Sequence, residues 1–365
     1  LHGLVRDEQG RKMSKSLGNV IDPLTVSERY GADALRLALI SGSTPGNDAK
    51  LSDEKIVAMR NFTNKLWNLA RYVGTQPTPD NEMPVTSRLP HTGEQNIKTD
   101  ADRWISEKLA AVTKSVTQHM DRYELSLATE ELRDFTWGDF ADWYVEVHKI
   151  EKNDVLLCSV FSTILRLWHP FMPFVTEAIH QTFRFDPSEL LMIARWPTSD
   201  TVQAEADVPA SQNRFELLKE LVVAIRNTRA SYRIEPAKKM SVSVFGPSEH
   251  LLRENEAIFQ RLTRVDEIRT IPESVAPDNT IPVQAGSLRI FLHLDGVIDT
   301  DKEKRRLENE LAEKTRYITS LQNRLDDPKF SSRAPEHILT QTKTLLDEAL
   351  IAVDHLKESL ARFER

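Results

Sequence analysis

Residues 101–121, ADRWISEKLAAVTKSVTQHMD, open a series of long helical patterns that decides the fold class. Apolar residues recur at helical spacing through this stretch, and similar patterns follow at residues 124–147, 154–169 and 172–183. Pro170 and Pro173 interrupt the series, because proline ends or kinks a helix. We therefore predict a mainly α-helical protein with a helical bundle at its centre.

The segment before the bundle reads as a strand and a turn followed by helices. Asp22-Pro23 is typical of a helix start, and Gly31 divides the apolar run that follows into two pieces. Ser52 is a candidate N-cap for an amphipathic helix over residues 55–73. The polar, proline-rich residues 74–100 then predict a linker or a long surface loop.

The segment after the bundle mixes helix and strand patterns. An acidic linker at residues 200–209 precedes a helix predicted over 211–230. The β-like run MSVSVF, residues 240–245, is followed by a helix predicted over 248–262. Three alternating runs then suggest strands near residues 267–272, 280–284 and 287–294. Together these patterns predict a small α/β connector module.

The tail, residues 301–365, has a heptad pattern that predicts an antiparallel coiled-coil hairpin. Leucine and isoleucine take the a and d positions of the first helix, with Lys314 as the polar exception. The stretch DDPKFSSRAP, residues 326–335, interrupts the pattern and forms the tip. Each helix would be about 40 Å long at 1.5 Å per residue. The predicted division is therefore residues 1–73, 74–200, 201–297 and 298–365.

The composition excludes several classes of protein. The chain has 365 residues and a net charge of −7, so nucleic-acid contacts must come from local basic patches. Its single cysteine, Cys158, excludes a disulfide framework and a multi-cysteine zinc site, and we expect this thiol to be buried and inert. The sequence has no membrane-spanning run and no signal peptide, so we expect a cytoplasmic protein. Because Leu1 opens in the middle of a motif, we also expect an internal fragment of a longer protein.

The decamer GRKMSKSLGN, residues 10–19, suits binding of a polyphosphate. Lys12 and Lys15 are point charges on flexible stems, and a loop can bring them to charge that develops during a reaction. Gly10 and Gly18 allow the backbone to reshape. A solvated basic turn is the alternative that composition alone favours.

Residues 12–16, KMSKS, are the complete signature loop of the class I aminoacyl-tRNA synthetases, and the chain resembles that family. The resemblance implies that the loop, Lys12, Met13, Ser14, Lys15 and Ser16, closes over ATP during amino-acid activation. Lys12 and Lys15 would stabilise the pyrophosphate leaving group, and the two serines would donate secondary hydrogen bonds. Mg²⁺ would accompany ATP, held largely by phosphates and water.

Further stretches resemble the valine-specific members of that family. These stretches are Tyr30–Val73, Phe140–Lys149, Leu167–Glu177, Ala224–Lys239 and Arg324–Leu339. The resemblance implies an anticodon-binding bundle preceded by a stem-contact region and followed by a tRNA-binding arm. It implies tRNA(Val) as partner, a monomer, and no structural zinc.

The sequence lacks a HIGH motif, so the catalytic half that binds valine is missing and the chain alone should not activate valine. Two alternatives to a valine-enzyme fragment stay open: a stand-alone tRNA-binding module, and a fragment of an isoleucine or leucine enzyme.

Two surfaces are predicted to bind tRNA. On helix 55–73, one face carries Arg60, Asn61, Asn64, Lys65 and Asn68, which can read splayed anticodon bases. A solvated face, with Phe62, Leu66 and Leu69 directed inward, is the alternative. The aromatic residues Trp137, Trp143 and Tyr144 are interpreted as core, with Trp143 the candidate to reach the anticodon.

The arm contributes basic residues that can follow a phosphate backbone, or that can pair within the hairpin instead. These candidates are Arg305, Arg306, Arg316, Arg324, Lys329 and Arg333.

Overall fold

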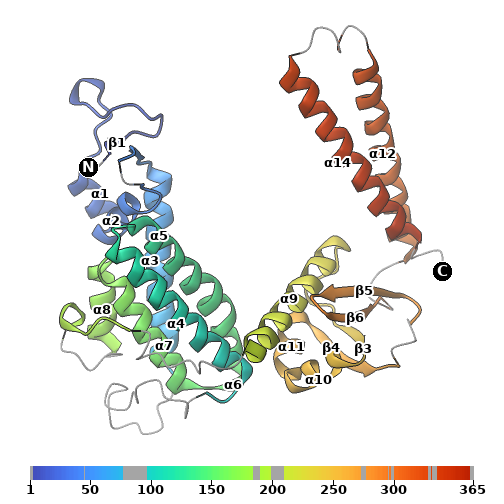
Figure 1. Cartoon of the computed structure of the whole chain (residues 1–365), viewed down its shortest axis with the longest axis horizontal. Helices are drawn as coiled ribbons and strands as arrows, with labels where there is room; N and C mark the ends of the chain where they lie inside the picture. Colours follow the sequence, from blue (N-terminus) through green and yellow to red (C-terminus); the bar gives the residue numbers. More distant parts are fainter. Residues whose placement is uncertain are drawn as a thin grey trace. The chain divides into compact units, whose positions relative to one another are not determined.

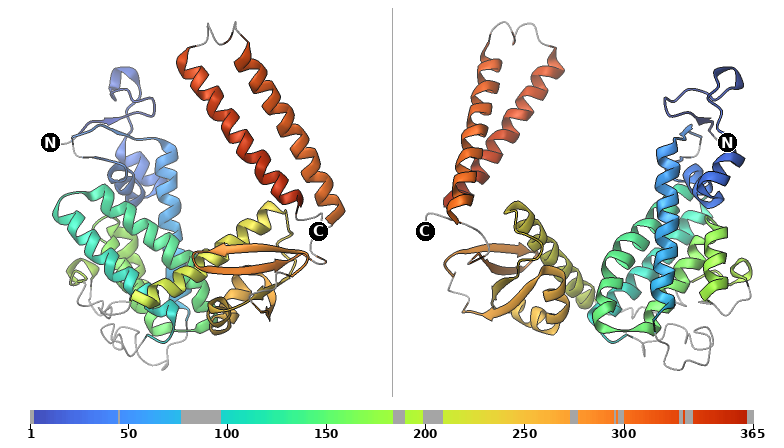
Figure 2. Two further views of the ribbon diagram at one scale, coloured as in Figure 1. Left: turned by 45° about the vertical axis from the view of Figure 1, so that its right-hand side comes forward. Right: turned by 180° about the vertical axis from the view of Figure 1, so that it is seen from behind.

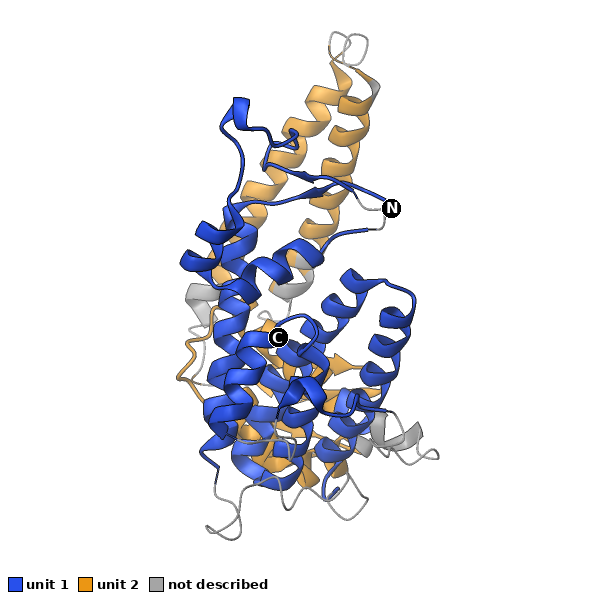
Figure 3. Cartoon of the chain, turned by 90° about the vertical axis from the view of Figure 1, so that its left-hand side faces the viewer, with its two compact units in different colours: residues 1–216 blue, residues 217–365 orange. Residues whose placement is uncertain are grey.

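A computed structural model describes residues 3–44, 46–76, 97–183, 190–198, 209–272, 277–294, 296, 300–327, 330 and 335–361. The chain forms two compact units, residues 1–216 and residues 217–365, which Figure 3 shows in different colours. No helix in the described ranges has the length and apolarity needed to cross a membrane.

Unit 1 begins with a small sheet and two short helices. Strand β1 (Val5–Arg6) pairs in parallel with β2 (Ala49–Lys50). Helices α1 (Pro23–Tyr30) and α2 (Ala32–Ile40) follow, and Gly31 between them has a φ of 92°, which glycine tolerates best. The predicted helix start at Asp22-Pro23 and the predicted break at Gly31 are both confirmed.

Helix α3 (Asp53–Gly74) joins this segment to the bundle. The Ser52 side chain accepts a hydrogen bond from the Lys55 amide, as the N-cap prediction requires. Phe62, Leu66 and Leu69 are buried, so the inward-facing stripe is confirmed. Through this stripe α3 packs against α7 (Asp154–Trp168) and α8 (Pro173–Phe183). Figure 2 shows the helices of unit 1 from two further directions.

The bundle continues with further helices that follow the predicted patterns. These are α4 (Asp100–Asp121), α5 (Leu125–Asp134) and α6 (Val145–Glu151). The short 3₁₀ helix η5 (Leu191–Ile193) lies outside the predicted patterns. Trp104 and Trp168 are fully buried among them and anchor the core. The mainly α-helical fold class is confirmed.

The predicted helix over 124–147 is not regular. Between α5 and α6 the chain forms a π-helix, η4 (Phe135–Tyr144), with hydrogen bonds from i to i+5. A wider helix changes which residues share a face, so the spacing of an α-helix does not apply to this segment. Within η4, Thr136 accepts a hydrogen bond from the Trp168 indole at 3.0 Å, which ties this segment to the core.

Buried polar contacts hold α2 to the start of α8. The Asp33 carboxylate accepts the backbone N–H groups of Phe174 at 3.3 Å and Val175 at 2.6 Å. Arg36, one turn further along α2, donates to the carbonyls of Pro170 and Phe171. The first backbone N–H groups of α8 have no partner within that helix, and the Asp33 carboxylate accepts hydrogen bonds from two of them. Burial nevertheless raises the pKa of Asp33.

Unit 2 contains a four-stranded sheet with the strand order β4-β3-β6-β5. Its strands are β3 (Met240–Val244), β4 (Val265–Thr270), β5 (Thr280–Ala285) and β6 (Leu288–His293). Strand β3 runs parallel to β4 and antiparallel to β6, and β5 is antiparallel to β6. The α/β character predicted for this segment is confirmed.

Three helices accompany this sheet (Figure 1). They are the part of α9 (Pro209–Ser231) from Leu217 on, α10 (Pro247–Glu254) and α11 (Glu256–Thr263). The single helix predicted over 248–262 is wrong, because the chain breaks at Asn255. The Asn255 side chain donates to the carbonyl of Leu251 at 3.0 Å and so ends α10.

The tail forms the predicted antiparallel helical hairpin from α12 (Thr300–Asp326) and α14 (Glu336–Ala361). Ile318, Ala349 and Val353 form its buried seam, and Leu311 and Leu346 pack against them. The heptad assignment of this arm is therefore confirmed. The predicted domain boundaries at residues 73, 200 and 297 stay a prediction.

Candidate functional site

The loop of residues 12–16 leaves the small sheet of unit 1 through a tight turn. The backbone of Asp7 and Arg11 closes this turn, with the Asp7 amide donating to the Arg11 carbonyl at 3.0 Å. Arg6 and Lys12 then form an isolated antiparallel bridge. The backbone of Lys12, the first residue of the loop, is therefore paired with the end of β1.

Asn19 closes the loop from its other end. Its side-chain oxygen accepts the Ser14 N–H at 2.9 Å, and its amide donates to the Lys12 carbonyl at 3.2 Å and to Asp7 Oδ2 at 2.9 Å. Asp7 is buried, and the hydrogen bond from Asn19, with further contacts from Arg11, lowers the pKa of its carboxyl group. We call Asp7 and Asn19 the loop clamp.

The serines of the loop shape its backbone. Ser14 caps the 3₁₀ helix η1 (Lys15–Leu17), where its hydroxyl accepts the Leu17 N–H and lies 3.1 Å from the Ser16 hydroxyl. Gly18 ends this turn with a φ of 65°. Lys12 and Lys15 are exposed and Met13 is half-buried. The clamp thus holds the backbone while both ammonium groups face solvent.

The predicted α3 face divides into two groups. Arg60, Asn61, Asn64 and Asn68 are exposed. Lys65 is instead held by Asp142, 3.1 Å from its ammonium group, and lies 3.4 Å from the centre of a tryptophan ring. Lys65 therefore contributes to the packing of α3 against η4, and the other four are available to a ligand.

The tryptophan beside Lys65 is Trp137, which the sequence pattern assigned to the core. That assignment is wrong, because Trp137 is 40% exposed while Tyr144 is buried. The π-helix explains the difference: i to i+5 bonding places Trp137 and Asp142 on one side, where both contact Lys65. Trp143 is half-buried, so the predicted aromatic candidate is less accessible than Trp137.

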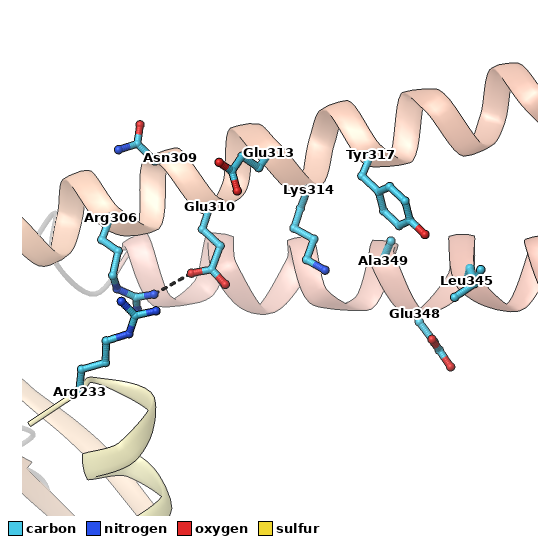
Figure 4. Close-up of a pocket in the computed structure, with 10 residues that line it drawn as sticks. All are labelled: Arg233, Arg306, Asn309, Glu310, Glu313, Lys314, Tyr317, Leu345, Glu348 and Ala349. Atoms are coloured by element: carbon cyan, nitrogen blue, oxygen red, sulfur yellow. Dashed lines mark hydrogen bonds and ion pairs between the residues drawn. The ribbon is translucent and has the colours of Figure 1, made fainter.

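The basic residues of the arm differ in their surroundings. Arg305 and Arg316 are exposed on α12. Arg306 forms an ion pair with Glu310 at 2.7 Å, which Figure 4 shows along the same helix. The guanidinium of Arg324 lies 4.4 Å from the centre of the Phe330 ring. Lys329 and Arg333 lie outside the described residues.

A buried polar cluster crosses the bundle between α4, α6 and α7. The Asp102 carboxylate accepts hydrogen bonds from the Tyr144 hydroxyl at 2.7 Å and the Asn153 amide at 2.6 Å. The Thr99 hydroxyl donates to Glu151 at 2.8 Å. Burial, with the charges of Asp102 and Asp100 nearby, raises the pKa of Glu151 to about 7.

Two residues considered for chemistry have structural surroundings. Cys158 is buried, and burial raises the pKa of its thiol to about 12, which suits the inert role predicted for it. His169 lies 2.8 Å from the Thr176 hydroxyl, so it is hydrogen-bonded within the bundle. No group of three or more metal-ligating side chains occurs in the described part of the chain.

Three family models match the chain. Residues 1–52 match "tRNA synthetases class I (I, L, M and V)", and residues 102–244 match "Anticodon-binding domain of tRNA ligase". Residues 299–364 match "Valyl tRNA synthetase tRNA binding arm". The signature loop, the bundle and these matches place the chain in the class I aminoacyl-tRNA synthetase family.

Within that class the chain matches the C-terminal portion of valine–tRNA ligases. It is 38% identical to the valine–tRNA ligase of Carboxydothermus hydrogenoformans, over 95% of the chain and 39% of that protein. It is 36% identical to the enzymes of Oceanobacillus iheyensis and Enterococcus faecalis, over 94% and 99% of the chain and 39% and 41% of each relative. The chain thus spans about two fifths of the length of these relatives.

Sequence reasoning missed three residues of these surfaces: Asp7, Asn19 and Trp137. Asn19 is the last residue of the stretch 10–19, so its position next to the loop could have indicated a contact with it. Asp7 is joined to it only by folding of the turn. No spacing rule for an α-helix places Trp137 at the surface, because η4 does not follow that spacing.

Proposed function

We propose that this chain supplies the ATP-clamping loop and the tRNA-gripping part of a valine–tRNA ligase. In the intact enzyme, the valine carboxylate attacks the α-phosphate of ATP and pyrophosphate leaves, which gives valyl-adenylate. The valyl group then passes to a hydroxyl of the tRNA 3′ end, and AMP leaves. The observation that carries the proposal is similarity to valine–tRNA ligases over 94–99% of the chain, together with the complete loop of residues 12–16.

Lys12 and Lys15 are assigned to the first step. Both ammonium groups are exposed on a backbone held by the loop clamp, so they are available to the pyrophosphate oxygens as negative charge develops. Mg²⁺ bound to ATP would be held largely by phosphates and water and would neutralise part of their charge. Ser14 and Ser16 act as secondary donors after release from their mutual contact.

The helical and arm surfaces are assigned to tRNA(Val). Arg60, Asn61, Asn64 and Asn68 present amides and a cation to unpaired bases, and the half-buried Trp143 stays a candidate beside them. Arg305 and Arg316 present cations to the phosphate backbone, with Arg306 and Arg324 nearby and Lys329 and Arg333 as candidates from the sequence.

A Lys15→Ala substitution in the intact enzyme tests the assignment. Loss of one ammonium group that stabilises the leaving group should lower valine-dependent pyrophosphate exchange by on the order of 10²-fold, with tRNA affinity changed less than about twofold. Lys50→Ala, outside the loop, is the control. An unchanged exchange rate in the Lys15→Ala enzyme would remove the assigned role.

A second assay tests the valine assignment against the alternative of an isoleucine or leucine enzyme. The 365-residue chain is titrated with tRNA(Val) and with isoleucine and leucine tRNAs, and exchange is measured in parallel. We expect preferential binding of tRNA(Val) without exchange by this chain alone. Preference for another anticodon would contradict the valine assignment.

A further inference from the structure

The connection between α2 and α3, described at residues 41–44 and 46–52, contacts the bundle at its first end. The Gly42 N–H donates to the Ser126 hydroxyl of α5 at 2.7 Å. The half-buried Lys55 of α3 donates from its ammonium group to the Ser41 carbonyl at 2.6 Å. The bundle therefore fixes the start of this connection.

At the other end of the connection, Asp48 stands directly before β2 and contacts the β1 segment. One carboxylate oxygen accepts the Leu4 N–H at 2.7 Å, and the other accepts the Nε–H of Arg6. The hydrogen bond from Leu4, followed by that from Arg6, lowers the pKa of the Asp48 carboxyl group, so this group is ionised at neutral pH. Asp48 thus adds a charged contact to the pairing of β1 with β2.

This charged contact reinforces a very short pair of strands. Strands β1 and β2 have two residues each, and so small a pair is marginally stable by itself. The backbones nevertheless approach closely, because a Cβ atom built on Gly3 would overlap the carbonyl oxygen of Asn47. The Asp48 carboxylate therefore supplies a restraint that the strand hydrogen bonds alone do not provide.

Arg6 extends the restraint to the signature loop. Its guanidinium also donates to the Gly10 carbonyl at 3.3 Å, in the turn that precedes the loop. Its backbone pairs with that of Lys12 in the isolated bridge. The Lys12 side chain is exposed, so the fold controls the position of its ammonium group through this backbone. A continuous set of contacts thus runs from Asp48 through Arg6 to Lys12.

We propose that Asp48 is a positioning residue for Lys12, because through Arg6 it fixes the backbone from which Lys12 reaches the pyrophosphate oxygens. The inference rests on the proposed function, since Asp48 acts only through Lys12. A displacement of about 1 Å at a reacting group can lower a rate by on the order of 100-fold, so this contact can control the activation step. Asp48 touches no substrate, so its loss affects the rate more than the affinity for ATP.

The test is a double-mutant cycle in the intact enzyme, followed by valine-dependent pyrophosphate exchange. Asp48→Asn keeps an acceptor for the Leu4 N–H and removes the charge that holds Arg6. This substitution is made alone and together with Lys12→Ala, and Arg6→Gln serves as a second variant that breaks the same contact. Asp53→Asn, at an exposed position in the first turn of α3, is the matched control. Far-UV circular dichroism checks that each enzyme keeps its helices.

We expect Asp48→Asn to lower kcat about tenfold and to change the KM for ATP less than about twofold. In the Lys12→Ala enzyme the same substitution should lower kcat less than about twofold further, because the group that Asp48 positions is already absent. Arg6→Gln should behave like Asp48→Asn in both backgrounds, and it decides the test if Asp48→Asn does not fold. Asp53→Asn should have the kcat of the unsubstituted enzyme.

Two results would overturn the inference and leave the proposed function standing. One is an unchanged kcat in a folded Asp48→Asn enzyme. The other is a full further loss, about tenfold, when Asp48→Asn is added to Lys12→Ala, because a general effect on the fold multiplies with any other loss. An unchanged exchange rate in the Lys12→Ala enzyme would instead overturn the proposed role of Lys12 itself, and the inference with it.

Discussion

Asn19 illustrates how much of the site depends on single side chains. One amide contacts both ends of the signature loop and the buried Asp7 carboxylate. Each of these hydrogen bonds is individually modest, on the order of 1 kcal/mol. Together these hydrogen bonds order the backbone that carries Lys12 and Lys15. The order of the loop therefore depends on Asn19 and not on the two lysines.

Asn19→Ala should therefore loosen the loop. The Ser14 N–H loses its acceptor, so its amide should exchange with solvent about tenfold faster, as measured by hydrogen exchange on this chain. Asn47→Ala is the matched control, because the Asn47 side chain donates to the nearby Thr44 hydroxyl at 2.8 Å in a different loop. Equal exchange of Ser14 in Asn19→Ala and the unsubstituted chain would show that the clamp does not hold the loop.

Glu151 gives the bundle a dependence on pH. Its pKa is raised from 4.5 to about 7 in the folded protein, so the folded state binds this proton more tightly than the unfolded state. The stabilisation is complete below about pH 4.5 and is lost as the pH rises through 7. Because the group is partly exposed, we expect a loss on the order of 1 kcal/mol.

Glu151→Gln should remove this loss, because glutamine keeps an acceptor for the Thr99 hydroxyl and does not ionise. Urea unfolding at pH 5 and pH 7.5 should show a smaller drop for this variant than for the unsubstituted chain. Glu28→Gln, at an exposed position on α1, should behave like the unsubstituted chain. A drop of equal size in all three proteins would contradict the role of Glu151.

Among the elements, the arm is held together along one seam between two helices. A two-helix hairpin buries little surface, so Ile318, Ala349 and Val353 carry much of its stability. Ile318→Ala should destabilise the arm by about 2 to 4 kcal/mol through lost burial and the cavity left behind. Thermal unfolding followed by circular dichroism measures this, with the exposed Gln322→Ala as control. Equal melting temperatures for the two variants would contradict the stabilising role of the buried seam.

The π-helix η4 is the element that the sequence could not reveal. Its residues FTWGDFADWY, 135–144, have aromatic spacing that fits an α-helix. Thr136 of η4 contacts Trp168 of α7, and Trp137 and Asp142 of η4 contact Lys65 of α3. The i to i+5 bonding depends on these contacts. These partners lie far away in the sequence, so local preference did not predict the distortion.

For the whole molecule, the net charge does not indicate the charge of the surface that binds RNA. The chain carries a charge of −7, yet its arm exposes Arg305, Arg316 and Arg324 on one helix. Binding by such a surface releases counterions from the RNA, so affinity should fall by on the order of tenfold or more between 50 and 200 mM salt. The acidic remainder of the chain keeps the attraction local to the arm.

Replacing these three arginines with alanine should lower the slope of log affinity against log salt by about 2 to 3. The measurement is filter binding of tRNA(Val) at a series of salt concentrations. Replacing Glu308, Glu313 and Asp326 on the same helix with alanine is the control and should not lower the slope. An unchanged slope in the arginine variant would remove the arm from the electrostatic contact.

The sequence alone determined the helix start at Pro23, the N-cap at Ser52, the heptad seam of the arm and the signature loop of residues 12–16, because caps, periodicity and short motifs act over neighbouring residues. Only the tertiary structure decided that Asp7 meets Asn19, that Lys65 is held by Asp142, and that Trp137 lies at the surface beside Gly138. These contacts join residues distant in sequence, and their free energy appears only when the helices pack together.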